Sequence, residues 1–210
     1  MPIAIATSKP ISREYIAYLF IDGAYLREIY KKIRKINDVF SQPDRYAAII
    51  STIISNCPKH QHLREYFDPA KLRIARTYYY DAIVRKEDDA EQYMKQKNFF
   101  DLINERVSQS RPFECKFEEL IKRTKKAKAK YHQKGVDTLL AIDMISKGYK
   151  GHYELAFLLA GDRDFLNVVK TVKDDIGKWV CGIYYKKETA KELVDLFDFK
   201  IDISSIIKRR

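Results

Sequence analysis

Short apolar stretches alternate along the chain with longer stretches in which apolar residues recur every three or four positions. Runs of β-branched and aromatic residues predict strands, and the longer period predicts amphipathic helices. We expect strands at residues 15–21, 72–80, 113–120, 155–160 and 180–185, with a small edge strand at 201–207. We expect helices at residues 24–36, 43–56, 88–107, 136–147, 165–172 and 188–197.

Strands that alternate with helices predict βαβ units, because parallel neighbours need a long crossover connection. The predicted fold class is therefore α/β, with a parallel sheet of about five strands sandwiched by helices. The two most apolar strands end near Asp22 and Asp162, and we expect them at the centre of the sheet because central strands are buried on both faces. No internal repeat and no linker rich in Pro, Gly or Ser divides the chain, so residues 1–210 are predicted to form a single domain.

The composition is that of an ordinary folded protein, with 46% hydrophobic and 33% charged residues in a chain of 210. No apolar run approaches the ~18 residues that cross a bilayer, and the N-terminal stretch lacks the basic region of a signal peptide. The three cysteines, Cys57, Cys115 and Cys181, are too scattered for a disulfide framework. These features exclude a membrane protein and a secreted disulfide scaffold, and they predict a cytoplasmic protein.

Basic residues outnumber acidic ones by 40 to 29, and much of the net charge of +11 is concentrated in one segment. This basic segment, residues 121–134, contains no acid and seven basic side chains: Lys122, Arg123, Lys125, Lys126, Lys128, Lys130 and Lys134. Lys and Arg bind polyanions by releasing condensed counterions, so the segment favours a nucleic acid as partner. The alternative is a solvated helix face or loop that binds nothing.

Four aspartates fall where a parallel sheet places its ligands, beyond the carboxyl ends of the strands. Asp22 follows the first predicted strand, Asp162 and Asp164 follow the fourth, and Asp137 begins the helix after the basic segment. Carboxylates that crowd together repel one another unless a cation lies between them, and Mg²⁺ or Mn²⁺ prefers such oxygen ligands. A metal held in this way activates water for phosphodiester cleavage.

Each of these aspartates also has a local explanation. Asp22 and Gly23 suit a simple turn, and Asp137, Asp162 and Asp164 are each suited to cap the N-terminus of a helix. Taken one at a time, the local explanation is favoured for each residue. Their joint placement at predicted strand ends favours the metal site.

Two further groups of residues carry weaker signals. Cys57, His60 and His62 lack a fourth ligand with regular spacing, so a zinc site is disfavoured. The consecutive tyrosines at 78–80 cannot all point to one side of a strand, and we expect them in the core. Stacking of one of them on a base is the alternative.

Four motifs follow one another along the chain: Phe-Ile-Asp-Gly at 20–23, Tyr-Tyr-Asp at 79–81, Lys-Gly-Val-Asp at 134–137 with Asp143 six residues further on, and Gly-Asp-Arg-Asp-Phe at 161–165. In this order they resemble the NYN domain family, LabA-like members of the PIN-like nuclease superfamily. The resemblance extends over about residues 15–185 and implies a Rossmann-like (PIN-like) sheet with a core of about residues 15–200. Residues 37–70 exceed what a minimal family domain requires, and we expect a helical insertion there.

Carried over position by position, the family's metal-binding and catalytic acids fall on Asp22, Asp137, Asp162 and Asp164. Asp143 matches a recurrent family acid, but it lies roughly 120° round the helix from Asp137. We therefore expect Asp143 to be a partly buried structural acid bonded to neighbouring backbone, with metal ligation as the alternative. Asp81 stays a secondary candidate.

Two positions depart from the family pattern. Many members have Asn three residues after the first aspartate, where this chain has Tyr25. Many also have Ser or Thr between the two aspartates of the Gly-Asp-Arg-Asp-Phe motif, where this chain has Arg163. Arg163 is suited either to contact a phosphate or to pair with an acid and weaken metal binding.

The resemblance and the charge together predict a Mg²⁺- or Mn²⁺-dependent ribonuclease that acts on single-stranded RNA. The basic segment and Arg163 would contact the RNA, and no membrane is involved. The first alternative is an inactive PIN-like module that binds RNA for regulation; a phosphatase or phosphotransfer domain is the second. A homo-oligomer and an inhibitory protein partner both stay open.

Overall fold

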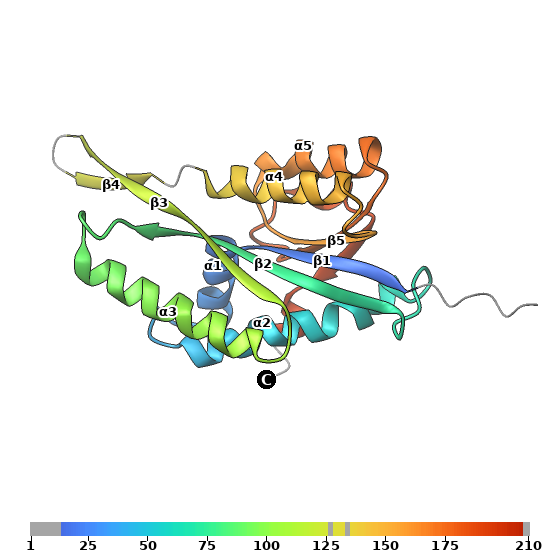
Figure 1. Cartoon of the computed structure of the whole chain (residues 1–210), viewed down its shortest axis with the longest axis horizontal. Helices are drawn as coiled ribbons and strands as arrows, with labels where there is room; N and C mark the ends of the chain where they lie inside the picture. Colours follow the sequence, from blue (N-terminus) through green and yellow to red (C-terminus); the bar gives the residue numbers. More distant parts are fainter. Residues whose placement is uncertain (1–13, 126–127, 133–134, 208–210) are drawn as a thin grey trace, which may run out of the picture.

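A sheet of seven strands runs through the part of the chain that the computed structural model describes, residues 14–125, 128–132 and 135–207 (Figure 1). The strand order across the sheet is β4-β3-β2-β1-β5-β6-β7. The bounds are Tyr15–Asp22 (β1), Leu72–Val84 (β2), Phe113–Lys125 (β3), Lys128–His132 (β4), Leu155–Leu159 (β5), Trp179–Tyr184 (β6) and Phe199–Asp202 (β7). Only β4 is antiparallel to its neighbour. The predicted α/β fold is thus confirmed, with six parallel strands rather than about five.

The first strand lies at the centre, as its apolar sequence predicts. β1 pairs in parallel with β2 on one side and with β5 on the other, and Asp22 lies opposite Tyr80 of β2. Successive residues of β1 enter opposite layers of the core, Leu19 and Ile21 on one face and Phe20 on the other. Because side chains alternate along a strand, Asp22 belongs to the face of Phe20.

Helices cover both faces of the sheet (Figure 1). The face that carries Leu19 and Ile21 is packed by α1 (Gly23–Arg34), α2 (Pro43–Asn56), α3 (Ala90–Ser108) and the short α7 (Ser204–Ile207). The opposite face is packed by α4 (Val136–Tyr149), α5 (Leu166–Lys170) and α6 (Lys191–Leu196). Short turns of 3₁₀ helix at Cys57–Lys59 (η1), Gln61–Leu63 (η2) and Arg163–Phe165 (η3), and a π turn at Thr171–Asp175 (η4), complete the described elements.

Two predicted elements near the C-terminus differ from those observed. The expected edge strand at 201–207 is wrong in its bounds, because β7 ends at Asp202 and residues from Ser204 form α7. The carboxylate of Asp202 accepts the backbone N–H of Ser204 and thereby starts that helical turn. The helix expected at 188–197 begins only at Lys191, because the Thr189 hydroxyl closes a turn onto the backbone of Tyr185.

The basic segment is not a helix face or a loop where the structure describes it. β3 continues to Lys125, and its last five residues pair with β4, so that Arg123 lies opposite Lys130 and Lys125 opposite Lys128. Lys126 and Lys134 lie outside the described residues, as do the side chains of the other basic residues of the segment. The nucleic-acid-binding role predicted for them therefore stays a prediction.

Residues 37–70 contain α2, η1 and η2. α2 packs against α3, and its buried Ile50 and Ile53 enter the core layer on that face of the sheet. The stretch is thus mainly helical and contributes to the core, and its interpretation as an insertion stays a prediction.

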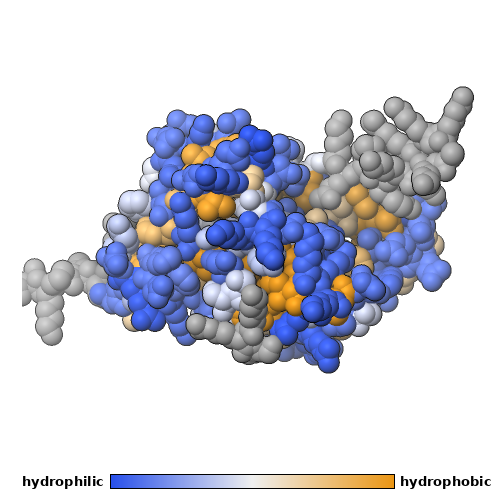
Figure 2. Space-filling model, turned by 180° about the vertical axis from the view of Figure 1, so that it is seen from behind, coloured by the Kyte–Doolittle hydropathy of each residue, from blue (hydrophilic) through white to orange (hydrophobic). Residues whose placement is uncertain are grey.

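The surface seen from behind is hydrophilic over most of its area, with hydrophobic residues gathered in smaller patches (Figure 2). None of the described helices is long and apolar enough to cross a membrane.

Candidate active site

Asp22 lies where β1 gives way to α1 and is only 8% exposed. Its carboxylate accepts the backbone N–H of Tyr25 at 3.1 Å and so caps the N-terminus of α1. Burial raises the pKa of Asp22 to about 6, and the negative charge of Asp137 adds to this rise. The Tyr25 N–H and the Arg27 guanidinium act in the opposite direction, but burial prevails.

Asp137 occupies the first turn of α4, whose N-cap is Gly135. Gly135 has φ of 120°, a backbone conformation that a residue with a side chain rarely adopts. Burial raises the pKa of the half-buried Asp137, and the charges of Asp162 and Asp164 raise it further. Asp137 is therefore not the N-cap of α4, and the neighbouring carboxylates disfavour its negative charge.

Asp162 and Asp164 follow β5 in a single exposed turn. One oxygen of Asp162 accepts the backbone N–H of Asp164 at 3.0 Å, which caps η3. The turn is anchored at Gly161, where the ring of Tyr25 fills the space that a side chain would take.

The four predicted acids lie at the carboxyl ends of β1 and β5 and in the first turn of α4. Asp137 interacts electrostatically with Asp22 on one side and with Asp162 and Asp164 on the other. The local explanations also hold for two of them, since Asp22 and Asp162 both cap helical turns. Within the described part of the chain, no group of three or more His, Cys, Asp or Glu residues is arranged to hold a metal ion.

Tyr25, at the position where many family members have Asn, connects α1 with two loops, the one after β6 and the turn after β5. Its hydroxyl bonds to the Thr189 hydroxyl and accepts the backbone N–H of Tyr185 at 2.9 Å. Burial raises its pKa to about 12, so the phenol stays neutral. Tyr25 therefore positions the site by packing and hydrogen bonding.

Arg163 forms an ion pair with Glu192 of α6, with an N–O distance of 3.0 Å. Both side chains are more than half exposed, and such exposed pairs contribute at most about 1 kcal/mol. Of the two roles considered for Arg163, pairing with an acid occurs, but the acid is Glu192 and not one of the four aspartates.

Asp81 lies on the opposite face of the sheet, in the layer of α1. It is fully buried, forms an ion pair with Arg27, and accepts the Tyr79 hydroxyl at 3.0 Å. A Cβ atom on Gly23 would lie 2.5 Å from one of its oxygens, so the β1–α1 turn rests directly on this carboxylate. Asp81 therefore supports the β1–α1 turn from the opposite face of the sheet, and it is not part of the group formed by the four acids.

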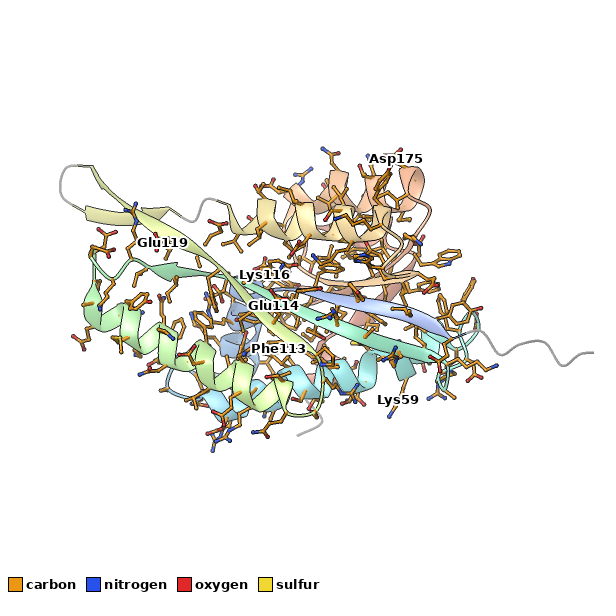
Figure 3. All side chains as sticks on the ribbon, viewed as in Figure 1. Lys59, Phe113, Glu114, Lys116, Glu119 and Asp175 are labelled. Carbon is orange, nitrogen blue, oxygen red and sulfur yellow. The ribbon has the colours of Figure 1, made fainter. Side chains whose placement is uncertain are left out.

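Asp143 is bound by side chains, so the expected bonding to neighbouring backbone is wrong. Its oxygens accept from Lys116 at 2.5 Å, Lys147 at 2.6 Å and the Tyr80 hydroxyl at 2.8 Å. Burial would raise the pKa of Asp143, but these three donors outweigh it and hold the pKa below its usual value. Both ammonium groups also lie over the Tyr78 ring. Figure 3 shows Lys116 on β3, between Glu114 and Glu119.

The remaining candidates belong to the core. Tyr78, Tyr79 and Tyr80 are all buried, with Tyr79 in one layer and its two neighbours in the other, so stacking on a base is not available to them. Cys57 is fully buried, and burial raises the pKa of its thiol, which disfavours metal ligation.

Sequence reasoning missed Arg27 and Lys116, because each acts through an acid distant in sequence. Arg27 pairs with Asp81 and lowers the pKa of Asp22, and Lys116 pairs with Asp143. The available signal was weak: a basic residue on the helix after the first strand, and one on the third strand.

Comparison with known proteins adds two matches. The family model of the NYN domain matches residues 17–204. Among solved structures, the crystal structure of a protein of unknown function from Vibrio parahaemolyticus matches with a TM-score of 0.57. The match covers 92% of this chain and 95% of that chain at 13% identity, so it shows likeness of fold alone. No curated protein matches the sequence.

Proposed function

The chain belongs to the NYN domain family, a family of PIN-like nucleases, and on this premise we propose that it is a metal-dependent ribonuclease. Its reaction would be hydrolysis of phosphodiester bonds in single-stranded RNA. The site would be formed by Asp22, Asp137, Asp162 and Asp164.

One observation carries the proposal: Asp137 is opposed electrostatically by carboxylates from two other elements. Mutual repulsion of this kind costs folding free energy that a core residue would not impose, and a bound cation removes it. Selection for stability alone favours neutral residues at such positions. The arrangement is therefore typical of a functional site.

The donor set fits a hard divalent cation, Mg²⁺ or Mn²⁺, because all four side chains offer carboxylate oxygens. Asp22 and Asp162 each use one oxygen as a helix cap and have a second oxygen to offer. Since no three acids are arranged to ligate an ion among the described residues, side-chain rotation would accompany binding. The bound ion would supply Lewis-acid stabilisation of charge on the phosphate and on the leaving oxygen.

The chain's own groups account for the rest of the reaction. A water oxygen would attack phosphorus, and its proton would pass to a carboxylate. The bond from phosphorus to the leaving oxygen of the RNA would break, and that oxygen would take up a proton from solvent. Burial raises the pKa of Asp22 to about 6 in the absence of an ion, which suits this carboxylate to accept the proton of the water when it is not itself a ligand of the ion.

The strands of the basic segment would bind the RNA backbone. β3 extends past the end of β1 and continues into its pairing with β4, within the segment 121–134 that carries seven basic residues and no acid. Arg163 would contact a phosphate by exchanging its exposed partner Glu192 for the RNA.

The test is cleavage of an end-labelled, partly structured RNA by substoichiometric protein with Mn²⁺, with Mg²⁺ or with EDTA. We expect cleavage with either metal, none with EDTA, and none by Asp162→Asn under any condition. Asp175→Asn is the matched control, since this exposed carboxyl (Figure 3) lies on η4, an element that carries none of the four acids. Because trace ribonuclease would contaminate all preparations alike, equal cleavage by the Asp162→Asn protein would reject the proposal.

A regulatory module that binds RNA without cutting it is the second candidate. The Tyr25 hydroxyl, engaged by Thr189 and Tyr185, replaces a polar side chain that many family members carry, which favours this reading. Tight RNA binding without cleavage in any metal would establish it.

A further inference from the structure

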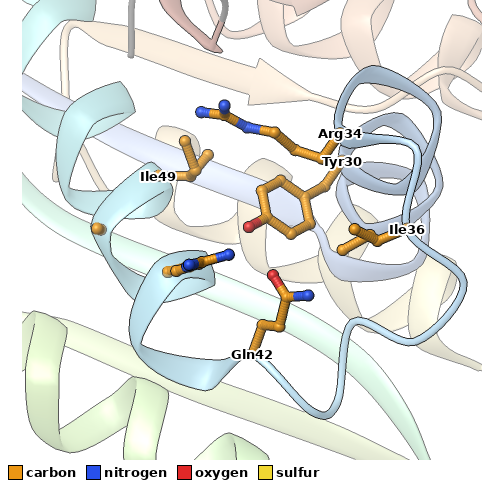
Figure 4. A pocket seen from close by; sticks show the side chains of 7 residues that line it. Tyr30, Arg34, Ile36, Gln42 and Ile49 are labelled. Atoms are coloured by element: carbon orange, nitrogen blue, oxygen red, sulfur yellow. The ribbon is translucent and has the colours of Figure 1, made fainter.

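A cavity lies between α1 and α2, at the end of α1 remote from Asp22 (Figure 4). Its volume is about 460 Å³. α1 caps on Asp22 at one end and contributes Arg34 to the cavity at the other. With a rise of about 1.5 Å per residue, the two sites are separated by roughly the full length of this helix. The cavity is therefore distinct from the acidic site.

Four polar side chains line the cavity, Tyr30 and Arg34 from α1, Arg45 from α2, and Gln42 from the residue before α2. In Figure 4 the Tyr30 ring lies between the side chains of Arg34 and Gln42. None of the described residues that line the cavity is acidic. With two arginines and no acid in its lining, the cavity is positively charged and favours an anion.

Tyr30 contributes a phenol to the lining of the cavity, although the residue as a whole is only 2% exposed. Burial raises the pKa of this hydroxyl, and the charges of Arg34 and Arg45 both act to lower it, which places the two guanidiniums near the phenol oxygen. A phenol in the lining of a cavity is placed to donate a hydrogen bond to an anion that the two guanidiniums attract.

The groups around the cavity add to its preference for an anion. Arg45 makes no ion pair or hydrogen bond within the described residues, and Arg34 donates to the backbone oxygen of Ile207, 3.2 Å away. Gln42 precedes the first turn of α2 and caps it with no side-chain hydrogen bond, so the N–H groups of that turn lack a side-chain acceptor.

We propose that this cavity binds a phosphomonoester, with its phosphate between Arg34, Arg45 and the Tyr30 hydroxyl. Two guanidiniums match a group that carries nearly two negative charges and several acceptor oxygens, which a single carboxylate does not. The apolar wall of Ile36, Ala48 and Ile49 would cover the organic part of the ligand. This binding is independent of the proposed nuclease activity.

The test is isothermal titration calorimetry of the full chain with adenosine 5′-monophosphate, in EDTA so that no divalent metal contributes. We expect saturable binding, weakened about tenfold or more by Arg45→Gln, and also weakened by Tyr30→Phe, which removes only the hydroxyl. Arg73→Gln, the loss of an exposed arginine on β2, is the matched control and should leave binding unchanged.

Three further titrants define the ligand class. Adenosine should not bind, inorganic phosphate should bind more weakly than the nucleotide, and malonate should not compete, since it offers carboxylates alone. Binding of malonate as tight as that of the nucleotide would overturn the assignment to phosphate.

The same assay separates this cavity from the acidic site. Nucleotide binding that falls in Asp162→Asn but not in Arg45→Gln or Tyr30→Phe would overturn the proposal, as would the absence of any binding. If Arg45→Gln fails to fold by circular dichroism, Tyr30→Phe alone decides the question.

Discussion

The ring of Tyr25 occupies the space that a Cβ atom on Gly161 would need. Through this contact the helix after β1 and the turn after β5 are held side by side, although they are far apart in the sequence. Asp22 begins that helix and Asp162 belongs to that turn, so the contact fixes the relative position of two of the four acids.

Gly161→Ala should therefore disturb the acidic site and the fold together. Overpacking of a tight contact costs about 1–3 kcal/mol, and displacement of the Asp162 turn should reduce cleavage further. Chemical denaturation and the RNA cleavage assay measure the two effects. Adding Tyr25→Ala should recover only part of the stability, because the backbone oxygen of Glu188 also lies 2.8 Å from that Cβ position. No loss of stability in Gly161→Ala would contradict the packing.

Asp22→Asn should abolish cleavage while making the protein more stable above neutral pH. Burial raises the pKa of Asp22 from 3.8 to about 6, so the folded state holds this proton more tightly than the unfolded chain. The carboxyl thus contributes its stability in full below the unfolded pKa and loses it as the pH rises through about 6. Asn keeps the helix cap without the charge, and the gain should reach up to about 3 kcal/mol at pH 8.

The measurement for Asp22→Asn is the free energy of unfolding at pH 4 and pH 8, without divalent metal. The difference between variant and parent should be largest at pH 8 and small at pH 4, and Asp174→Asn, an exposed residue, should show no such trend. A variant destabilised equally at both values would rule out the buried charge as the cause.

Asp143→Asn should reduce stability and spare the chemistry. The carboxylate neutralises Lys116 and Lys147, and its loss leaves two partly buried ammonium groups close together, at a cost of about 1–3 kcal/mol after allowance for their exposure. Because the pKa of Asp143 is lowered, its contribution is present above the unfolded pKa and is lost as the pH falls.

The readout for Asp143→Asn is thermal unfolding at neutral pH beside the cleavage rate at a temperature where the variant is folded. A cleavage rate within a few-fold of the parent supports a structural acid. Loss of cleavage by a folded variant would instead support the alternative role as metal ligand.

Arg163→Gln should weaken RNA binding and leave the fold unchanged. Its only described ion pair, with Glu192, is exposed and contributes at most about 1 kcal/mol. Glu192→Gln is the informative companion, because it frees the guanidinium and should tighten binding. Fluorescence anisotropy with a labelled single-stranded RNA measures both, and identical affinities in the two variants would exclude a phosphate contact by Arg163.

Much of the sheet could be predicted from apolar pattern, since β1 and β5 are buried on both faces and their sequences are almost wholly apolar. α2 was predicted with its observed bounds because Pro43 begins it and Cys57-Pro58 ends it. β4 was not predicted, because alternating Lys and Ala residues carry no strand signal and no Asn-Gly or Asp-Gly turn separates it from β3.

The acids at the strand ends could be predicted because topology alone brings the carboxyl ends of parallel strands together. The partners of Asp81 and Asp143 could not, because Arg27 and Lys116 meet them only through the packing of elements distant in sequence. The cavity around Tyr30 likewise depends on how α1 and α2 pack, which no local pattern encodes.

The pairing of β1 also sets the order in which the molecule can assemble. On one side Tyr15 pairs with Leu72, a separation of 72 − 15 = 57 residues, and on the other Ala17 pairs with Leu155, a separation of 155 − 17 = 138 residues. Nearer contacts cost less chain entropy, so we expect β1 and β2 to join early and β5 to insert beside β1 later. Pulse-labelling hydrogen exchange would detect this as earlier protection of the β1–β2 amides, and simultaneous protection would refute it. On a ribosome, Asp162 is made only after three quarters of the 210-residue chain, so the four aspartates come together only late in synthesis.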